Sequence, residues 1–345
     1  MQTLAVKYRP KTWDDVTEQD AIKIILKQQL ESGTVKNAYL FCGGAGTGKT
    51  TCARIFANEI NRGHGIPIEM DAASNSGVED VRNISQQAKT KSLDSEYKIF
   101  IIDECHAISN TGWQAFLKLI EEPPAKSIFI FCTTDPQKIP KTILSRVQRY
   151  DFKRISQKGI IDRLMLIADE EKEIDDSINW YGEALEYIAK IADGGMRDAI
   201  SLMDKCLSFN KDLTLKNVVK ALGTVDYHIM MDITDAILVT DGKQIIQVVE
   251  DMYREGKDVK QFVNQYVQFL LDIQKFGLSL PFKYLQIPET EDNKEWMEGL
   301  EQEDFEVCRN ILHGMVKLNS NIKWSQSAKY DLEATLMLIC AGEKI

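Results

Sequence analysis

The chain has 345 residues, of which 44% are hydrophobic and 27% charged, and its formal net charge is −10 at pH 7. This composition is typical of globular proteins, and the length predicts two or three domains. No apolar run approaches the roughly 18 residues of a membrane-spanning helix, and the N-terminus lacks a secretion signal. The seven cysteines are scattered without a CxxC pair, which favours buried thiols. We therefore expect a cytoplasmic protein with no membrane partner.

The charge is unevenly distributed along the chain. Residues 1–150 contain 19 basic and 17 acidic side chains, whereas residues 151–345 contain 23 basic and 35 acidic ones. A general nucleic-acid binder would be basic throughout. Any contact with DNA is therefore expected to be local and confined to the first half.

The first half predicts a parallel sheet covered by helices. Four short apolar runs, separated by helix-like stretches of 10–15 residues, predict strands at Ala38–Cys42, Ile68–Asp71, Ile99–Asp103 and Ile128–Thr133. Fully apolar strands that alternate with helices indicate a sheet buried on both faces, and hence an α/β fold.

The back half predicts helices only. Apolar residues recur at helical spacing from Met196 to Leu207 and again from Val259 to Ile273. No convincing strand follows Lys153. Breaks in the pattern near residues 153–157 and 222–226 predict two domain boundaries.

A glycine-rich segment between the first strand and the next helix predicts a phosphate site. Residues 43–50, Gly43-Gly44-Ala45-Gly46-Thr47-Gly48-Lys49-Thr50, fit the pattern G-x-x-x-x-G-K-[ST] in full and lead into a helix over about 49–61. Such a P-loop wraps a polyphosphate with backbone N–H groups. Lys49 would reach the β- and γ-phosphates, and the Thr50 hydroxyl would bind Mg²⁺. Thr51 follows within the same expected nucleotide site.

A second motif supports hydrolysis of the nucleotide. Asp103 and Glu104 come at the end of a buried strand. Asp103 would hold the Mg²⁺ through water, and Glu104 would orient the attacking water. The sequence 103–106, Asp-Glu-Cys-His, also resembles a helicase box, but the arginine motif of a second helicase domain is missing downstream. His106 is then interpreted as a capping or packing residue.

Several further segments, in fixed order, resemble one family. They are Tyr8–Val16 (YRPKTWDDV), Glu121–Pro124 (EEPP), Cys132–Pro140 (CTTDPQKIP) and Ile143–Arg146 (ILSR). Together with the two motifs above, they resemble the gamma/tau subunits of bacterial DNA polymerase III, AAA+ ATPases of the sliding-clamp loader. The resemblance is strong over about residues 5–210. It implies a P-loop AAA+ ATPase domain over 1–154, a helical lid over 155–224 and an all-helical oligomerisation collar over 225–345.

The resemblance also implies roles for single residues. Arg9, Pro10 and Val16 match the segment that lines the adenine pocket. Thr134 matches the sensor-1 position, and Arg197 matches sensor 2 on the lid. Arg146 matches the arginine finger that reaches the ATP site of a neighbouring subunit.

Partners and metals follow from the same resemblance. The expected cofactors are ATP and Mg²⁺, and the expected partners are delta- and delta-prime-type subunits, further copies of the chain, the sliding clamp and primer–template DNA. Arg82 and Lys118 fall where the family presents basic residues to DNA phosphates. Family members usually carry a four-cysteine zinc module where this chain has the cysteine-free residues 61–67, so we expect no zinc.

The predicted activity is therefore ATP hydrolysis that loads a ring-shaped clamp onto primed DNA. No polymerase carboxylate constellation is visible. The alternatives are another AAA+ motor such as a branch-migration helicase, a non-hydrolysing nucleotide switch, and a structural loader subunit. A branch-migration helicase would need a C-terminal winged-helix domain. A non-hydrolysing switch would lack Glu104, and a structural loader subunit would lack an intact P-loop.

Overall fold

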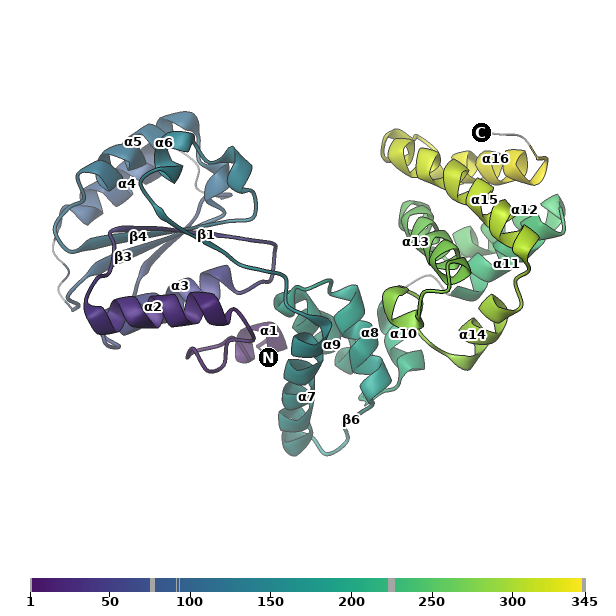
Figure 1. Ribbon diagram of the computed structural model, residues 1–345, viewed down its shortest axis with the longest axis horizontal. Helices are drawn as coiled ribbons and strands as arrows, with labels where there is room; N and C mark the ends of the chain where they lie inside the picture. Colours follow the sequence, from purple (N-terminus) through teal and green to yellow (C-terminus); the bar gives the residue numbers. More distant parts are fainter. Residues whose placement is uncertain (1, 75–77, 91, 93, 223–226, 343–345) are drawn as a thin grey trace. The chain divides into compact units, whose positions relative to one another are not determined.

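The computed structural model describes residues 2–74, 78–90, 92, 94–222 and 227–342 (Figure 1). The chain divides into two compact units, Met1–Leu215 and Lys216–Ile345. The predicted boundary between residues 224 and 225 lies outside the described residues. In the described ranges, no helix combines the length and the apolar content needed to cross a membrane.

The first unit is built on one parallel sheet of five strands. Their order is β2 (Ile68–Asp71), β3 (Lys98–Asp103), β4 (Ser127–Thr133), β1 (Ala38–Cys42) and β5 (Gln148–Asp151). Every residue of β1 and β4 is buried, which explains why these strands read as continuous apolar runs. The predicted parallel sheet is confirmed, but the edge strand β5 was not predicted because Gln148-Arg149-Tyr150-Asp151 has no apolar run.

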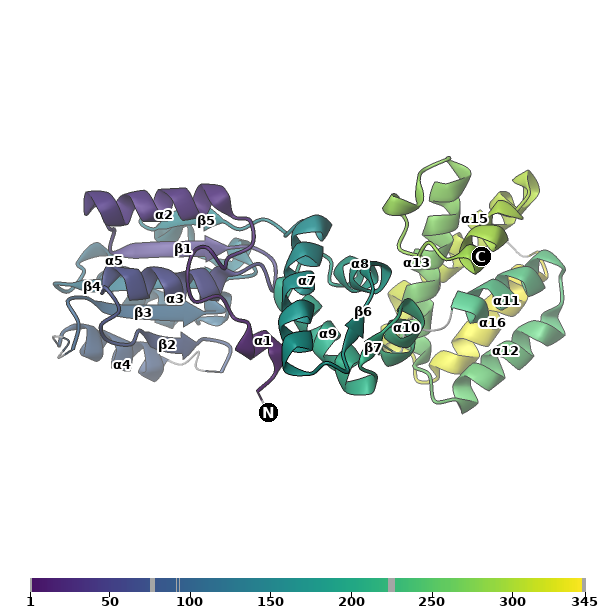
Figure 2. The same cartoon turned by 90° about the horizontal axis from the view of Figure 1, so that it is seen from below.

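Helices cover both faces of this sheet (Figures 1 and 2). One layer contains α2 (Asp20–Ser32) and α3 (Lys49–Ile60), and the other contains α4 (Val78–Ala88), α5 (Asn110–Glu121) and α6 (Lys141–Leu144). Alternate strand residues point to opposite layers: Phe41 packs in the α2/α3 core, while Leu40 packs in the α4/α5 core. Two 3₁₀ turns, η1 (Cys105–Ala107) and η2 (Pro136–Lys138), follow β3 and β4.

A helical subdomain completes the first unit. It consists of α7 (Gln157–Ile174), α8 (Gly182–Ile191) and α9 (Met196–Phe209), and the short α1 (Leu4–Lys7) packs on α9. Two two-residue strands, β6 (Asn179–Trp180) and β7 (Asp212–Leu213), pair in parallel here. The prediction that no strand follows Lys153 was therefore wrong, because pairs this short leave no alternating pattern in the sequence.

The second unit is helical throughout residues 227–342. Its elements are α11 (Tyr227–Leu238), α12 (Gly242–Arg254), α13 (Val259–Gly277), η3 (Phe282–Tyr284), α14 (Glu291–Glu298), α15 (Gln302–Asn321), η4 (Ile322–Trp324) and α16 (Ala328–Cys340). The helix α10 (Leu215–Leu222) begins at the division between the units. The core surrounds α13, where buried Tyr266 shares a 2.9 Å hydrogen bond with Thr234. This satisfied polar pair fixes the contact between α13 and α11.

Candidate active site

The P-loop connects β1 to α3 at the carboxyl edge of the sheet. Gly46 and Gly48 have φ values of +69° and +98°, a region that residues with a Cβ rarely adopt. Gly43 is required for a different reason: a Cβ there would lie 2.6 Å from the carbonyl oxygen of Phe152. The loop is therefore held closely against the strand end, and α3 presents its N-terminus to the space above the sheet.

Lys49 lies beneath the loop. The residue is 5% exposed, and its Nζ donates hydrogen bonds to the carbonyl oxygens of Gly43 (2.9 Å) and Gly44 (2.8 Å). The Thr47 hydroxyl donates to the Gly44 oxygen at 2.9 Å. These contacts place a buried ammonium group against the backbone that would surround a polyphosphate.

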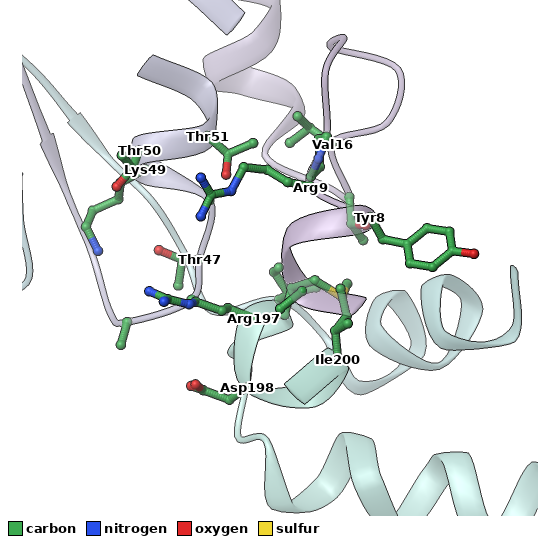
Figure 3. Close-up of a pocket in the computed structure, with 18 of the residues that line it drawn as sticks. Tyr8, Arg9, Val16, Thr47, Lys49, Thr50, Thr51, Arg197, Asp198 and Ile200 are labelled. Carbon is green, nitrogen blue, oxygen red and sulfur yellow. The ribbon is translucent and has the colours of Figure 1, made fainter. Parts of the chain in front are cut away.

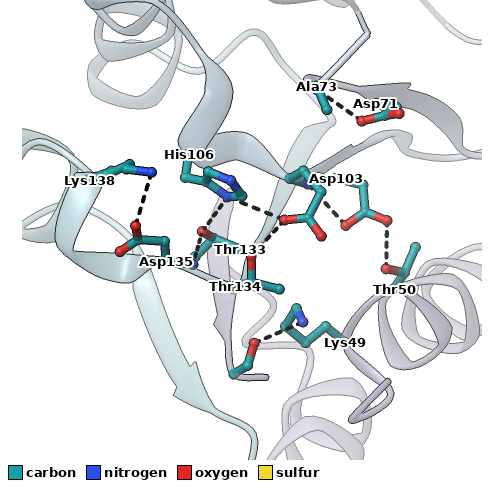
Figure 4. Close-up of polar contacts among 12 residues, drawn as sticks. Lys49, Thr50, Asp71, Ala73, Asp103, His106, Thr133, Thr134, Asp135 and Lys138 are labelled. Atoms are coloured by element: carbon teal, nitrogen blue, oxygen red, sulfur yellow. Dashed lines mark hydrogen bonds and ion pairs between the residues drawn. The ribbon is translucent and has the colours of Figure 1, made fainter. Parts of the chain in front are cut away.

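Thr50 and Asp103 meet across the space between α3 and β3 (Figure 4). The Thr50 hydroxyl donates a hydrogen bond to Asp103 Oδ2 at 2.7 Å, although the two residues are 53 positions apart in sequence. The second oxygen of Asp103 accepts the N–H of Glu104 at 3.0 Å. A hydroxyl and a carboxylate so close together are suitable oxygen ligands for Mg²⁺.

Glu104 is held in place through one of its two carboxylate oxygens. The Thr134 hydroxyl donates to Glu104 Oε2 at 3.0 Å, and His106 Nδ1 lies 3.2 Å from the same oxygen. His106 Nδ1 is also 3.2 Å from the hydroxyl of Thr133 (Figure 4). The backbone of Glu104 has φ +46°, in the left-handed region, so this site residue is held in a strained conformation.

The sequence interpretation of His106 as a local capping or packing residue was incomplete, since its ring contacts Glu104. A single histidine three residues after Asp103 forms no helical or strand pattern, so the sequence did not predict its contact with Glu104. The turn η1 brings its ring back toward the strand ends.

A pocket joins the P-loop to the N-terminal segment and to α9 (Figure 3). Among the residues predicted from the sequence it brings together Arg9, Pro10, Val16, residues 45–51, Asp103, Glu104 and Arg197. Figure 3 shows the side chains of Arg9, from the N-terminal segment, and Arg197, from the first turn of α9, extending toward the P-loop residues. Tyr8 and Arg163 also line the pocket and were missed, because their roles depend on contacts between distant segments.

The N-terminal segment is fastened to α7. The Tyr8 hydroxyl donates to Glu171 Oε1 at 2.7 Å, and Arg163 Nη2 donates to the Tyr8 carbonyl at 3.4 Å. Burial, followed by the bond to Glu171, raises the pKa of Tyr8 to about 12. Tyr8 therefore stays a neutral hydrogen-bond donor at physiological pH.

The first turn of α9 touches the P-loop directly. The N–H of Met196 donates to the carbonyl oxygen of Gly46 at 3.0 Å. A Cβ on Gly46 would lie 2.9 Å from the Cα of Gly195, so the two glycines permit this approach. Arg197 thus enters the pocket from a helix whose start is fixed to the P-loop backbone.

Three basic residues predicted from the sequence lie away from this pocket. Arg146 Nη2 lies 2.9 Å from Glu121 Oε1, and its Nη1 donates to the carbonyl of Thr142 at 2.8 Å. Arg82 on α4 and Lys118 on α5 are both exposed, on the helical layer that contains α4, α5 and α6.

The segment 61–67 forms a tight connection from α3 to β2. The Asn61 side chain donates to the carbonyl of Tyr97 and accepts its N–H, both at 2.9 Å. Within the described residues, no group of three or more His, Cys, Asp or Glu side chains is arranged to hold a metal ion.

Three cysteines near the carboxyl edge of the sheet, Cys42, Cys105 and Cys132, are buried and unreactive. Burial raises the pKa of Cys42 to about 11, and it raises the pKa of Cys105 and Cys132 well above the usual range. A thiol is nucleophilic only as the thiolate. These cysteines therefore serve as small apolar core residues.

Three family models match successive parts of the chain. "DNA polymerase III, delta subunit" matches residues 64–156, "DNA polymerase III clamp loader subunit, ATPase lid domain" matches 166–212, and "DNA polymerase III subunits gamma and tau domain III" matches 213–341. The tau subunit of Bacillus subtilis is 32% identical over 98% of this chain. The chain belongs to the gamma/tau subunit family of bacterial DNA polymerase III.

The chain is shorter than the relatives that it resembles. The tau subunits of Salmonella typhimurium and Escherichia coli are 30% and 32% identical over 97% and 81% of this chain. The chain spans 63% of the length of the Bacillus relative, 55% of the Salmonella relative and 46% of the Escherichia relative.

The solved structures agree on the fold. Thermotoga maritima RuvB, a Holliday junction branch migration motor, has a TM-score of 0.51 and 21% sequence identity, over 67% of this chain and 79% of the RuvB chain. A single-residue variant of the same motor gives a TM-score of 0.52 at the same identity and coverage. At this identity the likeness shows the AAA+ fold alone, which agrees with the predicted α/β architecture.

Proposed function

We propose that the chain binds ATP with Mg²⁺ and hydrolyses it as the motor subunit of a sliding-clamp loader. The observation that carries this proposal is the joining of an intact P-loop to Asp103, Glu104 and Arg197 in one pocket of a gamma/tau family member. ATP binding would organise a spiral of subunits, open the clamp and admit primer–template DNA. Hydrolysis would then release the closed clamp.

The residues around the pocket suggest how the reaction proceeds. When bound, Mg²⁺ would be held by Thr50 and Asp103 and would neutralise charge on the phosphates. Lys49 and the P-loop N–H groups would hold the β- and γ-phosphates. Glu104 would orient the attacking water with Oε1, since the two contacts from Thr134 and His106 are both on Oε2.

The remaining predicted residues would contact the adenine or the γ-phosphate, couple the nucleotide to the lid, or act in the site of a neighbouring subunit. Arg9, Pro10 and Val16 would surround the adenine, and Thr134 would contact the γ-phosphate through the same network that holds Glu104. Arg197 would couple the helical lid to the bound nucleotide. Arg146 lies outside the pocket of its own chain, which supports a role as an arginine finger in a neighbouring subunit.

The partners of this activity follow from the family. We infer that the second unit, which matches gamma and tau domain III, forms the oligomerisation collar with delta- and delta-prime-type subunits and with further copies. Arg82 and Lys118, exposed on adjacent helices, would contact phosphates of the primer–template without reading its sequence. The protein would act in the cytoplasm, at the nucleoid during loading.

The test is steady-state ATP hydrolysis by the purified chain, alone and with partner subunits, clamp and primed DNA. We expect slow hydrolysis by the lone chain and strong stimulation by the complete set. Equal rates in both conditions would contradict the clamp-loader proposal.

The alternative, a branch-migration motor, has less support. The likeness to RuvB is confined to the fold, and residues 227–342 contain helices without a strand. Unwinding of a four-way DNA junction by the purified chain would favour it instead.

A further inference from the structure

Two consecutive residues between the nucleotide pocket and α2 have strained backbones. Glu18 and Gln19 have φ values of +56° and +57°, the left-handed region that is costly for residues with a Cβ. They directly follow Val16 and Thr17, which line the pocket. Strain of this kind persists only where surrounding contacts impose it, and it therefore points to a function.

Gln19 pairs with the backbone that leads from β5 into the helical subdomain. Its Nε2 donates to the carbonyl of Lys153 at 2.7 Å, and its Oε1 accepts the N–H of Lys153 at 3.2 Å. The same Nε2 lies 3.5 Å from the carbonyl of Thr47 in the P-loop. One side chain thus connects the P-loop region to the segment 153–156.

Glu18 holds the other end of that segment. Its carboxylate oxygens accept the N–H of Ser156 at 3.2 and 3.3 Å, and the Ser156 hydroxyl also donates to Oε1. Ser156 is the N-cap of α7, so the carboxylate lies at the positive end of that helix. A Cβ on Gly159 would lie only 2.7 Å from Glu18 Oε1, which shows how closely α7 approaches it.

The segment 153–156 in turn contacts both the pocket and α9. Ile155 lines the pocket, and its N–H donates to the carbonyl of Gly194 at 3.1 Å. Arg154 Nη1 donates to the carbonyl of Asp193 at 2.9 Å. Gly194 is three residues before Arg197, so a movement of segment 153–156 would move the start of α9.

We propose that Glu18 and Gln19 form a tie that transmits nucleotide binding at the P-loop to the helical lid, with Gln19 acting as a positioning residue for Arg197. The path runs from residues 16–19 to segment 153–156 and from there to Gly194 and α9. The dipeptide itself bonds to the P-loop at Thr47 and to segment 153–156, and that segment bonds in turn to residues 193–194. The inference rests on the proposed binding of ATP in this pocket.

Hydrogen exchange of the full chain, with and without the non-hydrolysable analogue AMP-PNP and Mg²⁺, tests the tie. In the wild type, the analogue is expected to slow exchange in residues 43–50 and 193–199. In Gln19→Ala, at saturating analogue, residues 43–50 keep their protection while residues 193–199 lose most of theirs. The affinity for the analogue falls about three- to tenfold, the effect of one or two hydrogen bonds.

Two further variants make the result decisive. Gln28→Ala removes an exposed glutamine from α2, the helix that Gln19 precedes, and should behave as the wild type. Gln19→Glu keeps the acceptor for the Lys153 N–H but loses the donor, so it should give partial loss of protection, and it replaces Gln19→Ala if that variant does not fold. A general loss of stability would instead raise exchange throughout the chain, with or without the analogue.

The outcomes separate this inference from the proposed function. If the wild type binds AMP-PNP and Gln19→Ala retains full protection of residues 193–199, the tie is refuted while the proposed function stands. If the wild type binds no AMP-PNP, the proposed function fails and the inference fails with it.

Discussion

Lys49 shows at the scale of one residue what the structure adds to a motif. The sequence pattern assigns it to the phosphates, and the structure shows a nearly buried ammonium held by two P-loop carbonyls. Lys49→Ala should therefore abolish ATP binding and also destabilise the protein by about 1–2 kcal/mol, because two hydrogen bonds are lost. Calorimetric titration with ATP and thermal unfolding measure the two effects. ATP affinity within a factor of two of the wild type would contradict the assignment.

His106 gives a prediction that the motif alone would not. Its ring contacts the oxygen of Glu104 that does not face the proposed water, so it should orient Glu104 without binding nucleotide. His106→Ala should lower kcat about three- to tenfold, the effect of losing one polar contact to Glu104, with little change in KM. His64→Ala, in an exposed loop, is the matched control and should hydrolyse ATP at the normal rate. A change confined to KM would place His106 in binding instead.

At the scale of elements, the sequence was informative where the physical signal is local. Buried strands such as β1 and β4 read as apolar runs, and the P-loop reads as a motif, because both depend on neighbouring residues. The edge strand β5 and the short strand β6 depend on partners elsewhere in the chain. For the same reason Tyr8 and Arg163 could not be assigned to the pocket, since contacts between α7 and the N-terminal segment bring them there.

The connection over 61–67 allows a prediction about metal content. Asn61 closes this segment through two hydrogen bonds with Tyr97, and the segment has no cysteine. A structural zinc site needs about four N or S ligands. Elemental analysis of the purified chain should find well under one zinc per chain, and incubation with EDTA should leave its unfolding temperature unchanged. One tightly held zinc per chain would show that another set of ligands had been overlooked.

In the second unit, α11 and α14 are joined through Asp235, an acidic residue whose pKa is raised. Trp296 Nε1 donates to both oxygens of Asp235 at 3.1 Å, but desolvation raises the pKa of Asp235, with Asp232 and Asp304 adding to the effect. A raised carboxyl pKa means that folding stability is lost as the pH rises through that pKa.

Replacing this charge should therefore stabilise the second unit at neutral pH. Asp235→Asn keeps an acceptor for Trp296 and should raise the unfolding temperature at pH 7 by about 1–2 °C, within the usual range for surface changes. The difference should vanish in acid, where Asp235 is itself neutral. Scanning calorimetry at pH 7 and below pH 4 checks both points. A lower unfolding temperature at pH 7 would mean that the Trp296 contact outweighs the desolvation.

At the scale of the whole molecule, Arg146 tests whether the chain works only in an assembly. Its guanidinium is held by Glu121 and Thr142, outside the pocket of its own chain. Arg146→Ala should therefore leave ATP affinity of the lone chain unchanged. In the complete loader with clamp and primed DNA it should greatly reduce hydrolysis, because an arginine finger contributes about 10³–10⁵ in rate.

Mixing two defective chains gives the sharper form of this prediction. A Lys49→Ala chain keeps its finger but lacks a working pocket, and an Arg146→Ala chain has the pocket but lacks the finger. Where the first presents Arg146 to the second, the interface is complete, and the mixed loader should recover hydrolysis that neither variant supports in a loader of its own. No recovery, together with weaker ATP binding by the lone Arg146→Ala chain, would place Arg146 in its own site. The machine would then be a self-sufficient ATPase, in which neighbouring subunits supply no catalytic group.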